Sequence, residues 1–375
     1  MTVLAIGLLA SSVLLAVWCY LIYPPLIEKL ARAAPEGPPP QGPPPDSVEV
    51  LVSAADEEAV IGTRVADLLA QEIGARYSIS VGCDGSSDRT AERARASGDA
   101  RVRVVEFSRR RGKAAVLNDL VASSSAEVVV FTDANTRFEP GAAARLAASL
   151  RDPSVAAACG RLILEGSAPE SAFWNRETRT KSSEGRLGVC LGANGAIYAA
   201  RRTGIEPLPT DTTSMDDFLI PVHLARRGGR IVFVGDAVAR EGAARGAWPE
   251  MRRRFRIGVG AGQVLRRERW LWNARRRGLL TLVFFSRKAA RWLSPVLALA
   301  GVAAACAAPP LAFPGAVLLV LAAAAVAAAR AGARPSGVLG SLYYFAVLNL
   351  ALAFGVLCGL LGYRRPVWTP VARTA

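Results

Sequence analysis

The sequence has one histidine and no paired cysteines, and these shortages exclude several kinds of site. With His223 as the single histidine, a cluster of histidines cannot hold a metal ion, and a catalytic triad built on histidine is disfavoured. The six cysteines include no Cys-x-x-Cys pair, and three of them lie in apolar stretches. The sequence therefore indicates neither a disulfide framework nor a zinc site.

Acidic residues are scarce in one segment, which runs from Arg240 to Arg291 and holds 15 basic and 3 acidic residues. Most of the net charge of +15 therefore lies in this basic segment. It has neither interleaved aromatic and basic residues nor the spacing of zinc ligands, so we expect no nucleic-acid partner. Its tryptophans and its position beside apolar stretches indicate a helix on a membrane surface that contains anionic lipids.

Charge is absent from a long stretch near the N-terminus, Val3–Tyr23, whose 21 residues can span a bilayer. No basic segment precedes this stretch, so we expect an anchor rather than a cleaved signal peptide. Lys29 and Arg32 follow it, which places its carboxyl end in the cytoplasm.

Three further apolar stretches follow the basic segment, at residues 292–308, 311–329 and 338–362. If all three crossed the membrane, Arg364 and Arg365 would lie outside, against the tendency of basic residues to stay in the cytoplasm. One of the stretches could instead be re-entrant or interfacial, and the sequence leaves this open. We expect a multi-pass protein of the cell membrane whose catalytic domain is cytoplasmic.

Between the apolar ends, strand and helix patterns alternate, which predicts an α/β fold with a mostly parallel sheet. The first predicted strands are residues 48–52, 77–82, 102–106 and 128–132, and the helices between them are 57–70, 88–96 and 112–123. Helices are then predicted over 140–150, 171–184 and 215–227, and strands over 156–165 and 231–234, with a glycine-rich turn that leads into a strand over 192–200.

By composition the chain divides into six segments. These are a transmembrane anchor (1–24), a proline-rich linker (25–46), a cytoplasmic α/β domain (47–245), a basic interface segment (246–291), C-terminal transmembrane helices (292–363) and a tail (364–375).

The strand predicted over 128–132 leads directly into Asp133-Ala134-Asn135. Ligands of open α/β sheets bind just beyond the carboxyl ends of the strands. Asp133 and Asn135 would there offer hard oxygen ligands to Mg²⁺ or Mn²⁺, which in turn binds a diphosphate. Asp and Asn are also ordinary turn residues, and this stretch alone would favour a turn.

Further short elements occur along the chain, each at the end of a predicted strand or the start of a predicted helix. In order they are Ala54-Ala55-Asp56-Glu57-Glu58, Cys83-Asp84-Gly85-Ser86-Ser87-Asp88, Gly112-Lys113-Ala114-Ala115-Val116-Leu117-Asn118, Asp133-Ala134-Asn135, Gly195-Ala196, Asp216-Asp217 and a weakened Gln263-Val264-Leu265-Arg266-Arg267. Each element alone is weakly specific, but their number and order are not expected by chance.

With these elements the chain resembles the membrane-anchored glycosyltransferases of family 2, the superfamily of cellulose synthases, hyaluronan synthases and N-acetylglucosaminyltransferases. The resemblance runs from about Val48 to Arg267. It implies a GT-A fold, a nucleotide-sugar donor and a divalent cation, Mg²⁺ or Mn²⁺.

The resemblance implies that five residues bind the nucleotide-sugar, namely Asp56, Glu57, Asp84, Lys113 and Asp133. Asp84 would contact the base. Lys113, at a helix N-terminus, would lie near the phosphates, where the helix dipole also attracts anions. The alternative for each acidic residue is a turn or a helix cap. We interpret the neighbouring arginines 109–111 as a solvated loop.

The chain departs from the family pattern at three positions. Cys83 replaces an acidic residue, so the contact to the nucleotide is expected to differ. Asn135 replaces the commoner second Asp, which should weaken the metal site without abolishing it. Arg267 replaces a Trp that would stack on the acceptor sugar.

Asp217 is the candidate general base of an inverting transfer, and Asp216 has a supporting role by the same resemblance. A carboxylate within hydrogen-bond distance of the acceptor hydroxyl would take its proton as the anomeric carbon is attacked. The alternative is an acidic first helical turn that the helix dipole favours.

Acceptor-facing residues are also implied by the resemblance, and they are Trp174, Glu177, Gly195, Ala196, Gln263 and Arg266. A core position for Trp174 is equally compatible with the sequence. His223 is expected to be a buried residue with a polar partner rather than a catalyst.

We expect an inverting, metal-dependent glycosyltransferase at the cytoplasmic face of the membrane. Its donor would be a UDP- or GDP-sugar, and its acceptor a lipid-linked or growing saccharide of the cell envelope. The few, alanine-rich apolar stretches and Arg267 favour the addition of one or very few sugars per encounter. The alternatives are a processive polysaccharide synthase, a catalytically silent member of an assembly complex and, with less support, a nucleotidyltransferase.

Overall fold

The structure is a computed structural model that describes residues 1–35, 42–74, 76–165, 168–211, 213, 215–242, 246–333, 335 and 337–364, without the side chains of residues 168–175. The described chain forms two compact units. One unit contains residues 27–242, and the other combines residues 1–26 with residues 246–364. The proline-rich linker and the C-terminal tail predicted from the sequence lie partly outside the described residues.

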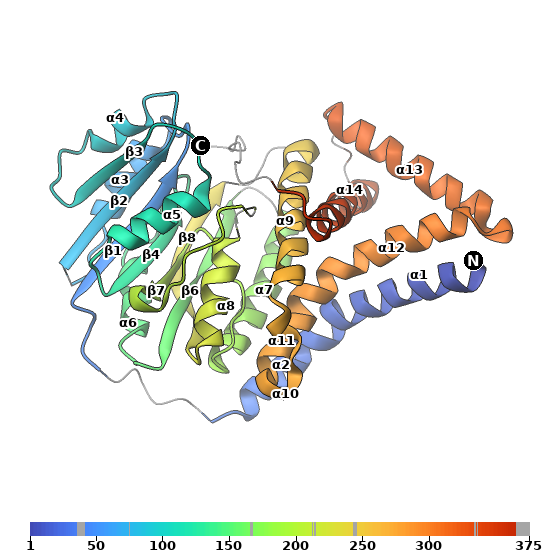
Figure 1. Cartoon of the computed structure of the whole chain (residues 1–375), viewed down its shortest axis with the longest axis horizontal. Helices are drawn as coiled ribbons and strands as arrows, with labels where there is room; N and C mark the ends of the chain where they lie inside the picture. Colours follow the sequence, from blue (N-terminus) through green and yellow to red (C-terminus); the bar gives the residue numbers. More distant parts are fainter. Residues whose placement is uncertain are drawn as a thin grey trace. The chain divides into compact units, whose positions relative to one another are not determined.

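The unit of residues 27–242 is built on one sheet, in which eight described strands follow the order β3-β2-β1-β4-β7-β6-β8-β5 (Figure 1). The strands are β1 Ser47–Ala54, β2 Arg76–Asp84, β3 Val102–Phe107, β4 Val128–Asp133, β5 Arg137–Phe138, β6 Val155–Glu165, β7 Tyr198–Arg201 and β8 Arg230–Gly242. The first four strands along the sheet are parallel, which confirms the predicted α/β class. Strand β7 runs antiparallel between β4 and β6.

Helices cover both faces of this sheet (Figure 1). They are α3 Ile61–Leu69, α4 Thr90–Arg95, α5 Lys113–Ser123, α6 Ala142–Ser149, α7 Ala168–Arg186 and α8 Asp216–Arg226, with a short 3₁₀ helix at Arg202–Gly204. Alternate residues of β1, such as Val50 and Val52, share one core with Ile61 and Val65 of α3, as the two-residue period of a strand requires. On the other face α5 approaches so closely that a side chain at Gly82 would collide with Val116.

Two element boundaries differ clearly from the sequence prediction, and one short strand was not predicted. Helix α3 starts at Ile61 rather than at Glu57, because Asp56 adopts a left-handed backbone, with φ 54°, and the next two backbone amides bond to side chains outside the helix. Strand β8 extends to Gly242 because β6 offers a parallel partner along this length. The two-residue strand β5 was missed because its pairing with β8 is invisible in so short a segment.

The second unit is helical. Its elements are α1 Thr2–Val17, a π-helical turn Trp18–Ile22, the first residues of α2 Tyr23–Ala33, α9 Ala247–Arg267, a 3₁₀ turn Arg269–Trp272, α10 Ala274–Arg277, α11 Leu279–Phe284, a π-helical turn Phe285–Ala289, α12 Ala290–Cys306, a 3₁₀ turn Pro309–Leu311, α13 Ala312–Arg330 and α14 Gly337–Leu360. By length and composition, four described helical stretches could cross a membrane: Thr2–Ala33, Leu279–Cys306, Pro309–Arg330 and Gly337–Leu360. They overlap the four apolar stretches that the sequence indicates, although the second begins at Leu279, inside the segment predicted to be basic and interfacial.

Helices α1 and α12 pack antiparallel along their whole length. Ala5 packs on Ala304 at one end. Ser12 Oγ donates to the Ser294 carbonyl at 2.8 Å in the middle. At the other end, in the π-helical turns that adjoin the two helices, Trp18 Nε1 donates to Ser286 Oγ at 2.9 Å. The two helices therefore form one antiparallel pair.

Candidate active site

Lys113 joins two carboxylates that are far apart in the sequence. Its Nζ donates to Asp133 Oδ1 at 2.9 Å and lies 3.3 Å from Asp216 Oδ1. Burial alone would lower the pKa of Lys113, but the carboxylates of Asp133 and Asp216 outweigh this effect and raise the pKa above its usual value. Lys113 is therefore charged at neutral pH, and it holds the end of β4, the start of α5 and the start of α8 together.

Tyr198 is a site residue that the sequence analysis missed. It is fully buried on β7, its hydroxyl donates to Asp216 Oδ2 at 2.9 Å, and its ring stacks on Phe131 with centroids 4.6 Å apart. Burial first, and the nearby Asp216 carboxylate second, raise the pKa of Tyr198 well above its usual value. The hydroxyl thus stays protonated and donates. No sequence signal reveals this contact, because it depends on the antiparallel register that pairs Phe131 with Tyr198.

Gly195 lies beside the carboxylates of Asp133 and Asp217. A Cβ at this position would be 3.8 Å from Asp217 Oδ2 and 3.9 Å from Asp133 Oδ2. Asp216 is buried, whereas Asp217 and Asp133 are partly exposed. The two partly exposed carboxylates, Asp133 and Asp217, therefore both lie beside Gly195, which adds no side chain between them.

A buried arginine, Arg64, is connected through Thr132 to the turn that carries Gly195. Arg64 Nη2 donates to Thr132 Oγ1 at 2.6 Å, and Thr132 Oγ1 donates to the Ala196 carbonyl at 2.7 Å. Burial lowers the pKa of Arg64 to about 10, although Asp67 opposes this effect. Ala196, predicted to face the acceptor, is itself buried and its carbonyl accepts this bond.

The donor atoms around Asp133 suit a hard divalent cation that also binds a diphosphate. Asp133 is partly exposed, and Asn135 follows it at the same strand end with a half-buried side chain. In the described part of the chain, no group of three or more His, Cys, Asp and Glu residues could hold a metal ion. A cation here would therefore need oxygen ligands from a bound diphosphate or from water in addition to Asp133 and Asn135.

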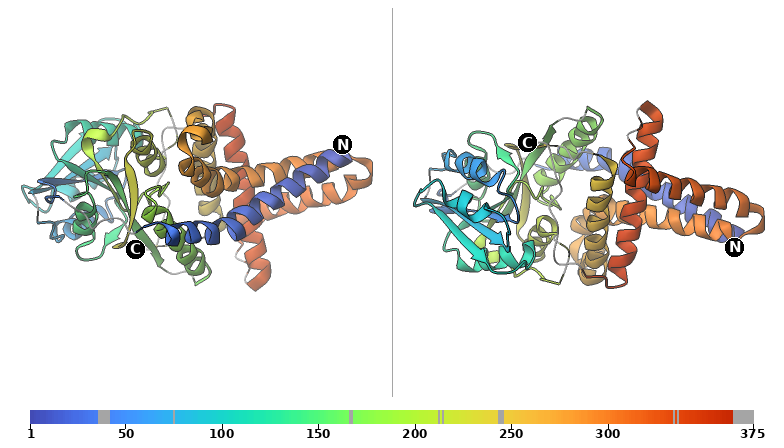
Figure 2. Two further views of the ribbon diagram at one scale, coloured as in Figure 1. Left: turned by 90° about the horizontal axis from the view of Figure 1, so that it is seen from below. Right: turned by 90° about the horizontal axis from the view of Figure 1, so that it is seen from above.

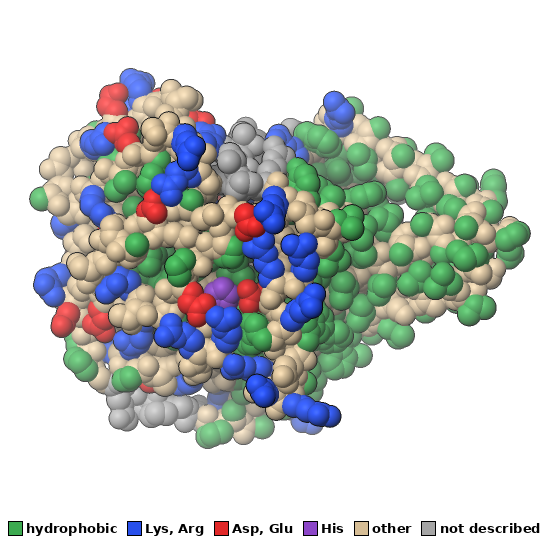
Figure 3. Space-filling view, in the orientation of Figure 1, with side chains coloured by type: hydrophobic (Ala, Val, Ile, Leu, Met, Phe, Trp, Pro, Cys, Tyr) green, Lys and Arg blue, Asp and Glu red, His purple; other side chains and the backbone are tan. Residues whose placement is uncertain are grey.

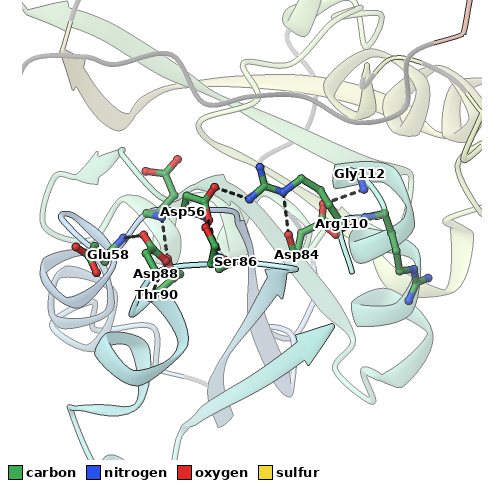
Figure 4. A network of polar contacts seen from close by, with 11 residues as sticks. Asp56, Glu58, Asp84, Ser86, Asp88, Thr90, Arg110 and Gly112 are labelled. Atoms are coloured by element: carbon green, nitrogen blue, oxygen red, sulfur yellow. Dashed lines mark hydrogen bonds and ion pairs between the residues drawn. The ribbon is translucent and has the colours of Figure 1, made fainter. Parts of the chain in front are cut away.

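Asp84 determines where helix α5 begins. Its Oδ1 accepts from the Arg111 backbone amide at 2.6 Å, and its Oδ2 accepts from the Gly112 amide at 2.8 Å. These bonds fix the loop that precedes α5, where Asp84 and Gly112 lie next to each other (Figure 4). They thereby fix the position of Lys113, the next residue. The chain passes so close to Gly85 that a side chain there would collide with the backbone of Arg110. The Asp-Gly pair thus shapes the loop that carries the predicted phosphate-binding residue.

The interpretation of arginines 109–111 as a solvated loop is wrong for Arg110. Arg110 Nη2 pairs with Asp56 Oδ2 at 2.6 Å, and its Nε donates to the Asp84 carbonyl at 3.3 Å (Figure 4). The hydrogen bond from Arg110 is the largest cause of the lowered pKa of Asp56. Only the tertiary fold reveals this contact, because it links the loops after β1, β2 and β3.

The loops after β1 and β2 are joined by a second set of bonds. The Glu57 amide donates to Thr90 Oγ1 at 2.8 Å, and the Glu58 amide donates to Asp88 Oδ2 at 3.1 Å (Figure 4). The Ser87 amide donates to Asp56 Oδ1 at 2.8 Å. The predicted donor-binding residues Asp56, Glu57 and Asp84 are therefore brought together at one edge of the sheet.

Two residues of the sequence motifs, Cys83 and Asn118, contact other parts of the protein interior. Cys83 is buried, and burial raises the pKa of its thiol to about 11, so a neutral group stands where the resemblance implies an acidic residue. Asn118 forms two bonds with one residue: its Oδ1 accepts from the Leu208 amide and its Nδ2 donates to the Leu208 carbonyl, both at 2.8 Å. Asn118 thereby holds the segment that leads to α8.

The predicted acceptor residues of α7 are only partly visible. The Trp174 side chain lies outside the described residues, and Glu177 is half-buried. Further along the helix Lys181 is buried and its Nζ donates to Asn194 Oδ1. Because Asn194 Nδ2 also donates to the Gly160 carbonyl at 2.9 Å, Lys181 anchors the glycine-rich turn.

Gln263 and Arg266 belong to the helical unit. Gln263 Nε2 donates to the Tyr363 carbonyl at 2.9 Å, and the Arg266 guanidinium lies against Gly362. Their contact with an acceptor stays a prediction. His223 is buried with its Nδ1 3.7 Å from Glu206 Oε2, as expected of a residue with a polar partner.

The sequence matches the glycosyltransferase like family 2 over residues 44–260. An N-acetylglucosaminyltransferase of Azorhizobium caulinodans is 23% identical over 230 residues, which cover 56% of this chain and 58% of that protein. Another, from Rhizobium leguminosarum bv. viciae, is 25% identical over 170 residues, which cover 42% of this chain and 40% of that protein. The chain thus spans less than two thirds of either relative's length.

The fold is similar to that of a mannosyltransferase from Pyrobaculum calidifontis, which was solved in complex with GDP-Man and Mn²⁺. The TM-score is 0.65 at 23% sequence identity, and the alignment covers 94% of this chain and 99% of the other. This similarity confirms the GT-A fold that the motifs imply.

Proposed function

Because the chain belongs to the glycosyltransferase like family 2, we propose that it transfers a sugar from a nucleotide-sugar to an acceptor hydroxyl, with inversion at the anomeric carbon. The observation that carries this proposal is that the carboxylates of Asp133 and Asp217, which are far apart in the sequence, both lie beside Gly195. One carboxylate lies at the strand end where a diphosphate would bind, and the other starts a helix that faces it.

Asp217 acts as the general base. The acceptor oxygen forms a bond to the anomeric carbon while the bond from that carbon to the diphosphate oxygen breaks. The hydroxyl proton passes to the Asp217 carboxylate, and the bonding electrons leave with the nucleoside diphosphate. The partial exposure of Asp217 suits this role. Asp216, which is buried between Tyr198 and Lys113, supports it from inside the protein.

The leaving diphosphate binds at the end of β4 and the start of α5. Lys113 supplies a positive charge there, and the Lys113–Asp133 contact of 2.9 Å keeps this charge beside the predicted metal ligand. Mg²⁺ or Mn²⁺, held by Asp133 and Asn135 together with diphosphate oxygens, would add positive charge that stabilises the leaving group. The nucleoside binds along the ends of β1 and β2, beside Asp56, Glu57 and Asp84.

The acceptor is a lipid-linked or growing saccharide at the cytoplasmic face of the cell membrane. Four helices of membrane-spanning length and hydropathy support membrane attachment. The basic segment around α9 supports contact with anionic lipid headgroups. Trp174, Glu177 and Gly195 are the proposed acceptor-side residues of the unit of residues 27–242. For Gln263 and Arg266, which belong to the helical unit, contact with the acceptor stays a prediction from the sequence.

We further propose that one sugar, or very few, are added per encounter. A processive synthase must hold its polymer, and here Arg267 stands where a Trp would stack on the acceptor sugar. The described helices of membrane-spanning length are also few. Size analysis of labelled product, made with acceptor in excess, distinguishes the two modes: long chains beside unused acceptor would show processive synthesis.

Release of nucleoside diphosphate by the purified full-length chain tests the function itself. The donors to try first are GDP-mannose and nucleotide-activated N-acetylglucosamine, each with Mn²⁺, with Mg²⁺ and with a chelator. We expect metal-dependent release with one donor, stimulated by a lipid-linked acceptor and strongly reduced by Asp217→Asn. A chain that binds a nucleotide-sugar tightly yet never turns it over would instead be a silent member of the family.

A further inference from the structure

Helices α9 and α14 lie side by side and point in the same direction. Gly258 of α9 packs against Gly355 of α14, where a Cβ on Gly258 would be 2.9 Å from the Gly355 Cα. One turn later Gly262 meets Gly359, and a Cβ on Gly359 would be 3.0 Å from the Gly262 Cα. Because the contacts advance together along both helices, the two helices are parallel.

The contact continues beyond the glycines at both ends. Before them, Ala247 and Met251 of α9 cluster with Tyr343, Tyr344 and Val347 of α14. After them, Gln263 Nε2 donates to the carbonyl of Tyr363, just past the end of α14. Helix α14 therefore follows α9 from Tyr343 to Tyr363 and never departs from it.

Helix α9 cannot cross a bilayer. It carries six arginines, Arg252, Arg253, Arg254, Arg256, Arg266 and Arg267. Figure 3 shows Lys and Arg side chains gathered over α9, whereas the surface of α1, α12 and α13 on the same face is hydrophobic or uncharged over nearly its whole length. Arginines at the centre of a membrane are costly and rare, so α9 belongs at the membrane surface.

Helix α13 brings the chain back to the level of α9. Gly315, near its start, packs on Cys306 at the end of α12, and Ala325 and Ala329, near its end, join the cluster with Ala247 of α9. Arg330 then lies over the Trp248 ring, 6.0 Å from its centroid. Helices α12 and α13 thus lead away from α9 and return to it. Figure 2 shows α14 running across the direction of α1, α12 and α13.

We propose that α9 and α14 form a paired element that lies in the plane of the membrane surface, so that only α1, α12 and α13 cross the bilayer. The arginines of α9 face anionic headgroups. The exposed apolar side chains of α14, which include Leu339, Leu342, Phe345 and Phe354, contact the acyl chains. Composition alone assigns α14 as a span, because a helix that buries one face on glycines and the other in lipid is apolar all round.

This arrangement fixes the side on which the chain ends. With three crossings, Arg364 lies on the same side of the membrane as the unit of residues 27–242, which connects directly to α2 and α9. Four crossings would place it on the opposite side. Three crossings thus keep Arg364 on the cytoplasmic side, in agreement with the positive-inside tendency, whereas four crossings would violate it.

Cysteine labelling in the full-length chain tests the number of crossings. In a background without the six native cysteines that retains membrane insertion, single cysteines are introduced as Thr374→Cys, Ser97→Cys and Ala307→Cys. Ser97 marks the unit of residues 27–242, and Ala307 marks the turn between α12 and α13. Cells expressing each variant are treated with a membrane-impermeant maleimide before and after permeabilisation.

We expect Ser97 and Thr374 to share one labelling pattern and Ala307 to show the opposite one. Labelling of Thr374 in the pattern of Ala307 would overturn the proposal, and so would a shared pattern of Ser97 and Ala307. The labelling result does not depend on enzymatic activity. The proposed topology can therefore be disproved while the proposed function holds, and the proposed function can be disproved while the topology holds.

Membrane depth along α14 provides a second readout. A fluorophore is attached in turn to Leu339→Cys, Phe345→Cys, Phe354→Cys and Leu361→Cys in reconstituted vesicles with phosphatidylglycerol, and quenched by lipids labelled at graded depths. An in-plane helix gives one common depth at all four positions. A depth that passes through the bilayer centre in the middle of the helix would show that α14 spans the membrane. Leu318→Cys in α13 is the spanning control, for which we expect the deep signal.

Discussion

The hydroxyl of Tyr198 donates a 2.9 Å hydrogen bond to Asp216 Oδ2, and the other oxygen of the same carboxylate lies 3.3 Å from Lys113 Nζ. Asp216 is therefore held from two sides, by a neutral donor and by a cation. Its neighbour Asp217 lies beside Gly195 instead. The two adjacent acids thus occupy different environments, one buried and one partly exposed, which suits a supporting group beside a base.

Tyr198→Phe should keep the stack on Phe131 and remove only the hydroxyl. Since a hydrogen bond to a charged group contributes about 1.5–3 kcal/mol, we expect kcat to fall by roughly 10- to 100-fold while nucleotide affinity is kept. Tyr77→Phe is the matched control, because the Tyr77 hydroxyl bonds to the Leu68 carbonyl, away from the site. If both variants lose the same amount of Tm but only Tyr198→Phe loses kcat, the Tyr198 hydroxyl positions Asp216. If Tyr77→Phe lowers kcat as much as Tyr198→Phe does, this role is contradicted.

Asp217→Asn keeps the shape of the side chain and removes the proton acceptor. Turnover should fall by roughly 10²- to 10⁴-fold. Nucleotide affinity should survive, because the proposed donor site lies at the ends of β1, β2 and β4. Isothermal titration with nucleoside diphosphate, run beside the rate assay, separates the two effects. A parallel loss of affinity would make Asp217 part of the donor site rather than the base.

One substitution should weaken the predicted metal site and another should strengthen it. Asp133→Asn should remove nearly all turnover, because it takes the charged ligand from the proposed cation and a partner from Lys113. Asn135→Asp should keep activity and lower the Mn²⁺ concentration needed for half-maximal rate, since it restores a carboxylate. Titration of the rate with Mn²⁺ measures both. Unchanged activity in Asp133→Asn, or full parental activity in chelator, would overturn the metal assignment.

Arg110→Gln should loosen the loops that form the proposed nucleotide site. The pair with Asp56 is partly exposed, so its effect on stability should be modest, about 0.5–1 kcal/mol. Nucleotide affinity should fall more clearly, because Asp56 and the Asp84 carbonyl both lose their bond to Arg110. Arg109→Gln removes an adjacent, exposed guanidinium and controls for net charge. Equal affinities of the two variants would show that the Arg110 contacts do not matter for the nucleotide.

The same pair predicts a pH dependence. The pKa of Asp56 is lowered from its ordinary value of 3.8, so the pair stabilises the fold fully above about pH 4, and this contribution is lost as the pH falls through the lowered pKa. The difference in Tm between the parent and Arg110→Gln should therefore be constant from pH 7 to about pH 5 and shrink below pH 4. A difference that grows on acidification would contradict the ion pair.

Local patterns determined much of the fold. The run Val128–Phe131 is apolar on both faces, as a buried parallel strand requires, and Val48, Val50 and Val52 alternate with Glu49 and Leu51. Both segments became central strands of the sheet. The start of α5 at Lys113 was also predicted to within one residue. The position of Asp133 at a strand end followed from the same reasoning. These features depend on the residues within one segment, which the sequence displays directly.

The pairing of distant segments was decided only by the tertiary structure. Tyr198 reaches Asp216 because β7 is inserted antiparallel beside β4, and Arg110 reaches Asp56 because three loops meet at one sheet edge. Hydropathy marks α14 as a possible span, but its glycine contacts with α9 support our proposal that it lies along the membrane surface. A one-dimensional pattern records how apolar or polar a segment is. Which surface covers that segment, and which charge neutralises a given side chain, depends on chain neighbours far away in sequence, and these are set only when the sheet order and helix packing are formed.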